Sequence, residues 1–222
     1  HDAMSAASAF ETLVTEHINN FDTGVYDPYS SKAEYGKFQD LLLDEMEPAL
    51  AQSPESIKWI EDATVKIDKA YATMVSTDID FTGASINAAA DVTAMIQSPS
   101  FSVPDPNDPS KELSSIKGWV TTEGNNANAT GAQNYEFYVG KGDADIHQVL
   151  YALPKGYYRL VYNGFYRAGG AVEAAVAHRD STDARNAKVY VEAGDGKWSK
   201  ELASIFDHVN EYKYDLSLIH IS

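Results

Sequence analysis

The spacing of apolar residues in this 222-residue chain changes once, after Thr77. Before Thr77, apolar side chains recur every three or four residues, a pattern that predicts amphipathic helices. After it, short runs rich in β-branched and aromatic residues alternate with turn-forming segments, roughly every 8–12 residues, which is typical of an antiparallel β-sandwich. The sequence therefore predicts an α + β multidomain chain, with helices first and a sandwich second.

Residues 1–77 contain three apolar stripes, which predict three helices joined by short connections. Such helices bury their stripes against one another, so we expect a small antiparallel three-helix bundle that serves as a spacer. Ser53-Pro54-Glu55 has the composition of a helix start, with Ser53 as the N-cap. The stripes are Phe10, Leu13, Val14, His17, Ile18 and Phe21; Tyr35, Phe38, Leu41, Leu42, Met46 and Leu50; and Ile57, Ile60, Thr64, Ile67, Tyr71 and Met74.

The rest of the chain is predicted to consist of a linker and one sandwich domain. Residues 78–90 are the linker and residues 91–215 are the sandwich. Proline- and glycine-rich stretches inside the sandwich mark its loops. The predicted strands are Trp119–Thr122, Tyr135–Val139, Ile146–Leu150 and Lys188–Ala193. The predicted loops are a turn-rich one at 104–113 and a mobile one at 169–186, and Gly194-Asp-Gly-Lys is predicted to form a turn.

The densest aromatic run, residues 157–169, follows the turn Leu153-Pro154-Lys155-Gly156 and predicts the main strand. Alternation would place Tyr158, Leu160, Tyr162, Gly164 and Tyr166 on a core face. The opposite face would carry Tyr157, Arg159, Val161, Asn163, Phe165 and Arg167. Guanidinium, amide and aromatic groups together are unusual on a plain solvent face. We therefore expect a ligand to bind there.

The chain is acidic, with a formal net charge of −16 and a pI of about 4.6. Such a field repels nucleic acid and anionic lipid, so neither is an expected partner. No apolar stretch is as long as a membrane span. The absence of cysteine leaves the compartment open, because a core of adequate size needs no disulfide.

Both ends of the sequence suggest that it was cut from a longer one. The chain begins His1-Asp2 instead of with methionine. The final run, residues 216–222, resembles the translated sequencing-adapter read-through found at the ends of some metagenomic gene predictions, which would make it a non-native tail and the sandwich incomplete. The alternative is a genuine apolar strand.

Two sets of motifs resemble known families. Tyr26-x-x-Tyr-Ser, followed by a helix and Ser53-Pro-Glu-Ser-Ile, is similar to FIVAR-type helical modules. The second half resembles the galactose-binding-like jelly-roll domains, related to carbohydrate-binding modules, of surface proteins from Bacteroidetes. That resemblance is carried by Asp91-Val-Thr-Ala-Met-Ile-Gln-Ser-Pro-Ser-Phe101, Gly118-Trp119, Gln148-x-Leu-x-x-Leu-Pro-Lys-Gly156, Asn163-Gly-Phe-Tyr-Arg167, Val189-Tyr-Val-Glu-Ala-Gly and Ser199-Lys-Glu-Leu-Ala-Ser-Ile.

The resemblance implies a jelly roll at the cell surface or outside the cell, with a glycan or cell-surface polysaccharide and other domains of the parent protein as partners. No cofactor is expected. A structural calcium ion, which many such domains hold, stays open, because Ser98 and Ser102 replace the asparagine and the acidic residue usual there. The metal ligands are therefore unknown.

Trp119 and Tyr138 complete the predicted ligand-binding set of Arg159, Asn163, Phe165 and Arg167. Aromatic faces pack on the apolar side of sugars while amide and guanidinium groups pair with hydroxyls. For Trp119 a core position is the alternative.

Catalysis is not expected from this chain. The pairs Asp78/Asp80 and Asp143/Asp145 lie in turns, where aspartate bonds the local backbone, and lack the apolar surroundings of a general acid. The histidines show no zinc-binding spacing. The sequence thus favours a non-catalytic glycan-binding module, which could be a fragment of a multidomain carbohydrate-active enzyme. The alternative is a structural or adhesive protein-interaction module.

Overall fold

The computed structural model describes residues 3–52, 56–121, 126–128, 136–138, 144–167, 169–184 and 187–207. The chain forms two compact units, residues 1–155 and 156–222. The first unit holds helices and short antiparallel strand pairs, and the second holds a helix and a β-hairpin. The predicted mixture of helix and antiparallel sheet is therefore confirmed.

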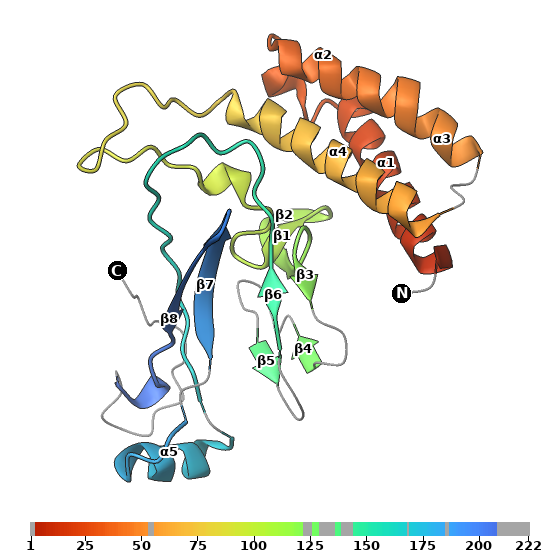
Figure 1. Cartoon of the computed structure of the whole chain (residues 1–222). Helices are drawn as coiled ribbons and strands as arrows, with labels where there is room; N and C mark the ends of the chain where they lie inside the picture. The colour runs from red at the N-terminus through yellow and green to blue at the C-terminus, as the bar shows by residue number, and fades with distance from the viewer. Residues whose placement is uncertain are drawn as a thin grey trace. The chain divides into compact units, whose positions relative to one another are not determined.

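The helical part of the first unit is built from α1 (Ala3–Asp22), α2 (Ala33–Asp40), α3 (Glu47–Ala51) and α4 (Ile57–Ser76) (Figure 1). A short 3-10 turn, η1 (Asp27–Tyr29), lies between α1 and α2. A π-helical turn, η2 (Leu41–Met46), joins α2 to α3 without a break. The Glu47 N–H there donates to the Leu42 carbonyl, five residues back, directly before Pro48, which has no N–H to donate.

The core of these helices contains most of the residues that the apolar stripes predicted, together with Tyr26 and Ala63, which they did not, whereas the stripe residue Ile57 is exposed. Its least accessible side chains are less than 2% exposed and come from α1, the α2–η2 stretch and α4. They are Phe10, Val14, Phe38, Leu42, Ile67 and Met74. Trp59 packs its ring edge to face with Phe10, at 5.4 Å between centroids.

The predicted helix start at Ser53 needs a correction. Helix α4 begins at Ile57, and its N-cap is Ser56, whose Oγ accepts a hydrogen bond from the Trp59 N–H at 3.2 Å. Serine is a good N-cap wherever its oxygen reaches the third helical N–H, and the sequence offers two serines in four positions. Residues 53–55 lie outside the described residues.

The remainder of the first unit contains the 3-10 turn η3 (Thr93–Met95) and three antiparallel strand pairs. Strand β1 (Ser102–Asp105) pairs with β2 (Asp108–Ser114), β3 (Val120–Thr121) with β6 (Ile146–His147), and β4 (Asn126–Asn128) with β5 (Glu136–Tyr138). The strands predicted at Trp119, Tyr135 and Ile146 are thus present, and the one at Ile146 is shorter than expected, because residues 148–150 form no strand. Thr122, Tyr135 and Val139 lie outside the described residues.

The prediction of a loop at 104–113 is wrong, because these residues form most of the β1–β2 hairpin. Its turn is Pro106-Asn107, and the Asp105 carboxylate accepts from the Asn107 N–H at 2.8 Å. The prolines that suggested a loop are tolerated because the hairpin is two-stranded, so each strand keeps one edge without ladder bonds. Residues 78–90 contain only an isolated bridge, Ser85–Ala88. The predicted domain boundaries around them stay a prediction.

The second unit contains α5 (Ala171–Arg179), the hairpin of β7 (Lys188–Ala193) and β8 (Gly196–Glu201), and the 3-10 turn η4 (Ile205–Asp207) (Figure 1). The strand Lys188–Ala193 and the turn that follows it at Gly194, where φ is +57°, were predicted, whereas the second strand of the hairpin, β8, was not. The mobile loop predicted for 169–186 is wrong, since α5 lies within it. Alanine is the best helix former, and Glu173 in the first turn and His178 in the last complement the helix dipole.

The prediction of a long strand at 157–169 is also wrong for the residues that the structure describes. Residues 157–165 belong to no strand, and only Tyr166 forms a bridge, parallel to Ser204. Tyr158 and Leu160, expected in the core, are 49% and 46% exposed. Aromatic residues favour strands because they pack against neighbouring strands. Among the described residues, this run pairs with another segment only at the Tyr166–Ser204 bridge.

Candidate functional site

Residues 161–166 keep the side-chain alternation of a strand although they form no ladder. Val161, Asn163 and Phe165 are exposed, whereas Tyr162, Gly164 and Tyr166 are half-buried. The bridge at Tyr166 fixes the end of this segment, because its N–H donates to the Ala203 carbonyl at 2.8 Å and its carbonyl accepts from the Ile205 N–H at 3.0 Å. The two faces predicted from the sequence therefore exist over this part of the run.

The half-buried face of the segment is turned toward the side chain of Leu202. A Cβ placed on Gly164 would lie 3.3 Å from a methyl carbon of Leu202. Leu202 extends β8, since its N–H donates to the Ala187 carbonyl at 2.9 Å. By alternation, Leu202 shares its side of the hairpin with Trp198 and with the partner of Trp198 on β7, Val191. This side is called the apolar face below.

The opposite side is called the outer face. It unites the predicted ligand residues of the segment with alternate residues of β7 and β8. Its hairpin residues form the cross-strand pairs Lys188–Glu201, Tyr190–Ser199 and Glu192–Lys197. Exposure places Val161, Asn163 and Phe165 of the segment on this side, and we assign Arg159 and Arg167 to it by extending the alternation beyond residues 161–166.

Tyr190 and Lys197 are members of the outer face that the sequence did not single out. The Lys197 ammonium lies 4.8 Å from the centre of the Tyr190 ring and also contacts the Glu192 carboxylate. Their shared face follows from the register Glu192–Lys197 and Tyr190–Ser199. The predicted strand at Lys188–Ala193 with its Gly194 turn was the available signal for it.

The four predicted ligand residues of the second unit differ in accessibility. Arg159 and Asn163 are exposed, Phe165 is 37% exposed and Arg167 is half-buried. Among the residues that the structure describes, neither arginine forms an ion pair with a carboxylate. Both guanidinium groups therefore have donors available for a ligand.

Trp119 and Tyr138 belong to the first unit, so the structure does not gather all six predicted residues within one unit. Tyr138 is the last residue of β5, and its side chain lies outside the described part. Trp119 is half-buried, donates its indole N–H to the Ser98 carbonyl at 3.2 Å and packs on Phe101 at 5.0 Å. These contacts give Trp119 a packing role, and ligand binding by it stays a prediction.

Segments far apart in the sequence meet around Trp119. The side-chain amide of Gln148 bonds both backbone groups of Gln97, at 2.8 and 3.0 Å. Gly118 has a φ of +80°, and a Cβ there would lie only 2.5 Å from the Gln97 side chain. The motif residues near 97–101, 118–119 and 148 thus form one packed cluster, which we call the Gln97–Gln148 cluster.

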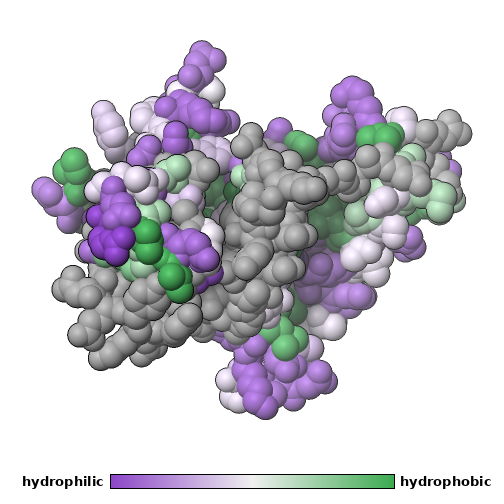
Figure 2. Space-filling model, turned by 90° about the horizontal axis from the view of Figure 1, so that it is seen from below, coloured by the Kyte–Doolittle hydropathy of each residue, from purple (hydrophilic) through white to green (hydrophobic). Residues whose placement is uncertain are grey.

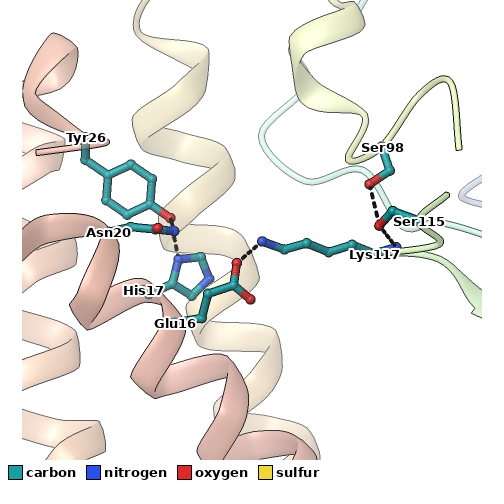
Figure 3. A network of polar contacts seen from close by, with 7 residues as sticks. All are labelled: Glu16, His17, Asn20, Tyr26, Ser98, Ser115 and Lys117. Atoms are coloured by element: carbon teal, nitrogen blue, oxygen red, sulfur yellow. Dashed lines mark hydrogen bonds and ion pairs between the residues drawn. The ribbon is translucent and has the colours of Figure 1, made fainter. Parts of the chain in front are cut away.

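A buried polar network lies inside the helical part (Figure 3). Tyr26 OH lies 2.6 Å from His17 Nδ1 and accepts from the Asn20 amide at 3.0 Å. Burial lowers the pKa of His17 to about 4, with Glu16 partly opposing and Lys117 adding to the effect, and burial raises the pKa of Tyr26. A neutral His17 and a neutral Tyr26 satisfy each other at pH 7, so this network is structural.

Of the carboxylates considered for catalysis, Asp78, Asp80 and Asp145 are engaged in local contacts. Asp78 pairs with Lys32 at 3.5 Å, and the Thr82 backbone N–H lowers the pKa of Asp80 by bonding its carboxylate. Asp145 lies 2.6 Å from Nδ1 of His147, while Asp143 is outside the described residues. A lowered pKa is opposite to what a general acid requires.

One histidine in the second unit lies between carboxylates. His178 Nδ1 is 3.5 Å from Asp183 and 3.9 Å from Asp207, and its ring packs on Phe206 at 5.8 Å. These contacts connect the end of α5 to η4. Within the described residues, no group of three or more histidine, aspartate or glutamate side chains could hold a metal ion. Binding of a structural calcium ion by this chain stays an open prediction.

On the side drawn in Figure 2, hydrophilic residues predominate among the coloured ones, and the coloured hydrophobic residues form small separate patches. None of the helices in the described ranges is both long and apolar enough to cross a membrane. No protein-family model matches the sequence, and no similar curated protein or solved structure was found.

Proposed function

We propose that this chain is a non-catalytic glycan-binding module of a bacterial surface or secreted protein, and that the outer face of the second unit is its binding surface. The supporting observation is the alternation at residues 161–166. Asn163 and Phe165 are exposed while their neighbours turn toward Leu202. An exposed ring beside amide and guanidinium donors offers a sugar both the apolar contact and the hydrogen bonds it needs.

The jelly-roll fold and the three-helix bundle are part of the same proposal. Val191 and Trp198 on the apolar face are 44% and 61% exposed, and a sheet with one apolar face is stable when a second layer covers it. A galactose-binding-like jelly roll supplies such a layer. A three-helix bundle of the FIVAR type would then act as the spacer of this module. The Gln97–Gln148 cluster fits the resemblance, because the motif residues that carry it pack together.

The test is binding of the full chain to an array of soluble glycans, followed by titration of the best ligand. Phe165→Ala and Asn163→Ala should each weaken binding by about tenfold, the loss expected for one aromatic or hydrogen-bonding contact. Trp198→Ala is the matched control, since it removes an exposed ring from the opposite face of the same unit. It should leave the affinity unchanged.

The alternative is a structural or adhesive protein-interaction module. Its supporting observation is the exposure of apolar side chains in the second unit, among them Tyr157 at 103% and Val161 at 63%. Failure of every glycan on the array to bind would overturn the glycan proposal and leave this alternative. Equal losses of glycan affinity from Phe165→Ala and Trp198→Ala would contradict the assignment of the binding surface to the outer face.

A further inference from the structure

The negative charge of this protein is confined to its first unit. Residues 1–155 contain 24 acidic and 9 basic residues, whereas residues 156–222 contain 9 acidic and 8 basic ones. The two units therefore carry formal charges of −15 and −1. The net charge of the whole chain therefore does not describe the composition of the second unit.

The outer face of the second unit has an excess of basic residues. Its basic residues are Arg159, Arg167, Lys188 and Lys197, and its acidic residues are Glu192 and Glu201. Glu192 is occupied by Lys197. In a protein with a net charge of −16, this distribution singles out the face as a surface that suits an anion.

The two arginines are the groups best able to hold an anion. An arginine whose charge is already paired holds a carboxylate of its own chain. Arg179 in the same unit does this, because its guanidinium donates to both oxygens of Asp180, at 2.8 and 3.2 Å. Arg159 and Arg167 have no such carboxylate among the residues that the structure describes. A planar guanidinium fits carboxylate and sulfate groups with two parallel hydrogen bonds.

We propose that the ligand of the outer face is an acidic glycan, one whose sugars carry carboxylate or sulfate groups. This inference rests on the proposed function and names its substrate class. Arg159 and Arg167 take the acidic groups, and Asn163 and Phe165 between them contact the sugar rings. An extended chain rises about 3.3 Å per residue, so the eight steps from Arg159 to Arg167 span at most about 26 Å, which suits an oligosaccharide more than a single sugar.

A nucleic acid is a poorer fit than an acidic glycan. Its charge density is about one phosphate per 1.7 Å of duplex, and binding relies on neutralising many phosphates at once. The outer face offers only four basic residues for this. Single-stranded DNA is therefore a control in the test.

The experiment titrates the full chain with four oligomers of similar length. They are neutral galactan, galacturonan with carboxylates, sulfated galactan with sulfates, and single-stranded DNA. We expect at least one acidic galactan derivative to bind about tenfold or more tightly than neutral galactan, since charged hydrogen bonds are added. Its affinity should fall as NaCl is raised from 50 to 300 mM.

Variants assign the effect to the arginines. Arg159→Gln and Arg167→Gln should each weaken acidic-glycan binding about tenfold and reduce its salt dependence, with neutral galactan hardly affected. Arg179→Gln is the control, being exposed in the same unit but paired with Asp180. Because Arg167 is half-buried, a thermal melt checks that Arg167→Gln is folded. If that variant is unfolded, Arg167→Lys, which keeps the positive charge, is measured in its place.

Each outcome decides a different point. Equal binding of neutral and acidic galactans overturns the acidic ligand but leaves the glycan proposal standing. Binding of none of the four oligomers, together with a negative array, overturns both. Binding of DNA as tight as that of the acidic galactans overturns the choice of a glycan. An acidic preference that Arg159→Gln and Arg179→Gln reduce equally overturns the role given to the outer face.

Discussion

At the scale of single residues, the clearest consequence of burial concerns His17. It is 6% exposed, and its ring packs against those of Phe38 and Tyr71. Desolvation disfavours the charged imidazolium, so the pKa of His17 is about 4 in the folded chain, compared with 6.5 when exposed. Between these values the unfolded state binds more protons than the folded one. The stability contribution is therefore complete above pH 6.5 and is lost as the pH falls toward 4.

We predict that His17 makes the helical part acid-sensitive. Between pH 7 and pH 5 the free energy of unfolding should fall by about 2 kcal/mol through His17 alone, and by about 3 kcal/mol in total near pH 4. Urea unfolding followed by circular dichroism at each pH measures this loss. His17→Phe, which keeps a ring of similar size, should show a correspondingly shallower decline between pH 7 and pH 5. Parallel declines for the two proteins would contradict the assignment to His17.

At the scale of elements, the Gln97–Gln148 cluster depends on a glycine conformation. Gly118 has a positive φ and lies against Gln97, whereas Gly83 has a similar φ of +76° with nothing near its missing Cβ. The two glycines therefore share the backbone requirement and differ in packing. They offer a matched comparison of strain with and without steric conflict.

We predict that Gly118→Ala destabilises the first unit more than Gly83→Ala does. The left-handed backbone alone should cost about 1 kcal/mol in each variant, and the contact with Gln97 should add about 1–3 kcal/mol for Gly118→Ala. Urea unfolding of both variants measures the difference. Equal destabilisation would show that Gln97 moves aside freely, and that the cluster is looser than its hydrogen bonds imply.

The elements that the sequence predicted correctly are those whose signal is local. Apolar spacing located the helices because a stripe is buried whichever partner covers it, and Gly194 located the β7–β8 turn because few residues adopt its φ. The run at 157–167 was assigned to a strand on aromatic content, yet a ladder also needs a neighbouring strand along its length. Helix α5 was overlooked because its alanines resemble loop composition when no apolar stripe is present.

The candidate site was predictable in part for the same reason. Alternation separated Asn163 and Phe165 from Tyr162 and Gly164 without any knowledge of the partner chain. Tyr190 and Lys197 join the outer face through hairpin register and through the contact between Gly164 and Leu202, and sequence spacing specifies neither. Trp119 was assigned to the site by residue type, whereas its hydrogen bond to Ser98 depends on the tertiary fold.

At the scale of the whole molecule, the uneven charge affects stability as well as binding. A formal charge of −15 on the first unit means that carboxylates repel one another wherever they lack a basic partner. Several ion pairs offset part of this repulsion, including Lys58–Asp62 and Lys66–Glu45, but all of their side chains are largely exposed. Such pairs are worth about 0–1 kcal/mol each, so the net repulsion persists.

We predict that screening this repulsion stabilises the helices. Raising NaCl from 10 to 200 mM should increase the melting temperature, followed by circular dichroism at 222 nm, by about 2–4 °C for each kcal/mol of repulsion removed. A triple variant, Glu11→Gln, Asp22→Asn and Glu61→Gln, removes three exposed carboxylates from α1 and α4. It should melt higher than the parent chain at 10 mM NaCl and gain less from added salt. A melting temperature that falls with salt in the parent chain would mean that the exposed ion pairs outweigh the repulsion, because screening then removes more attraction than repulsion.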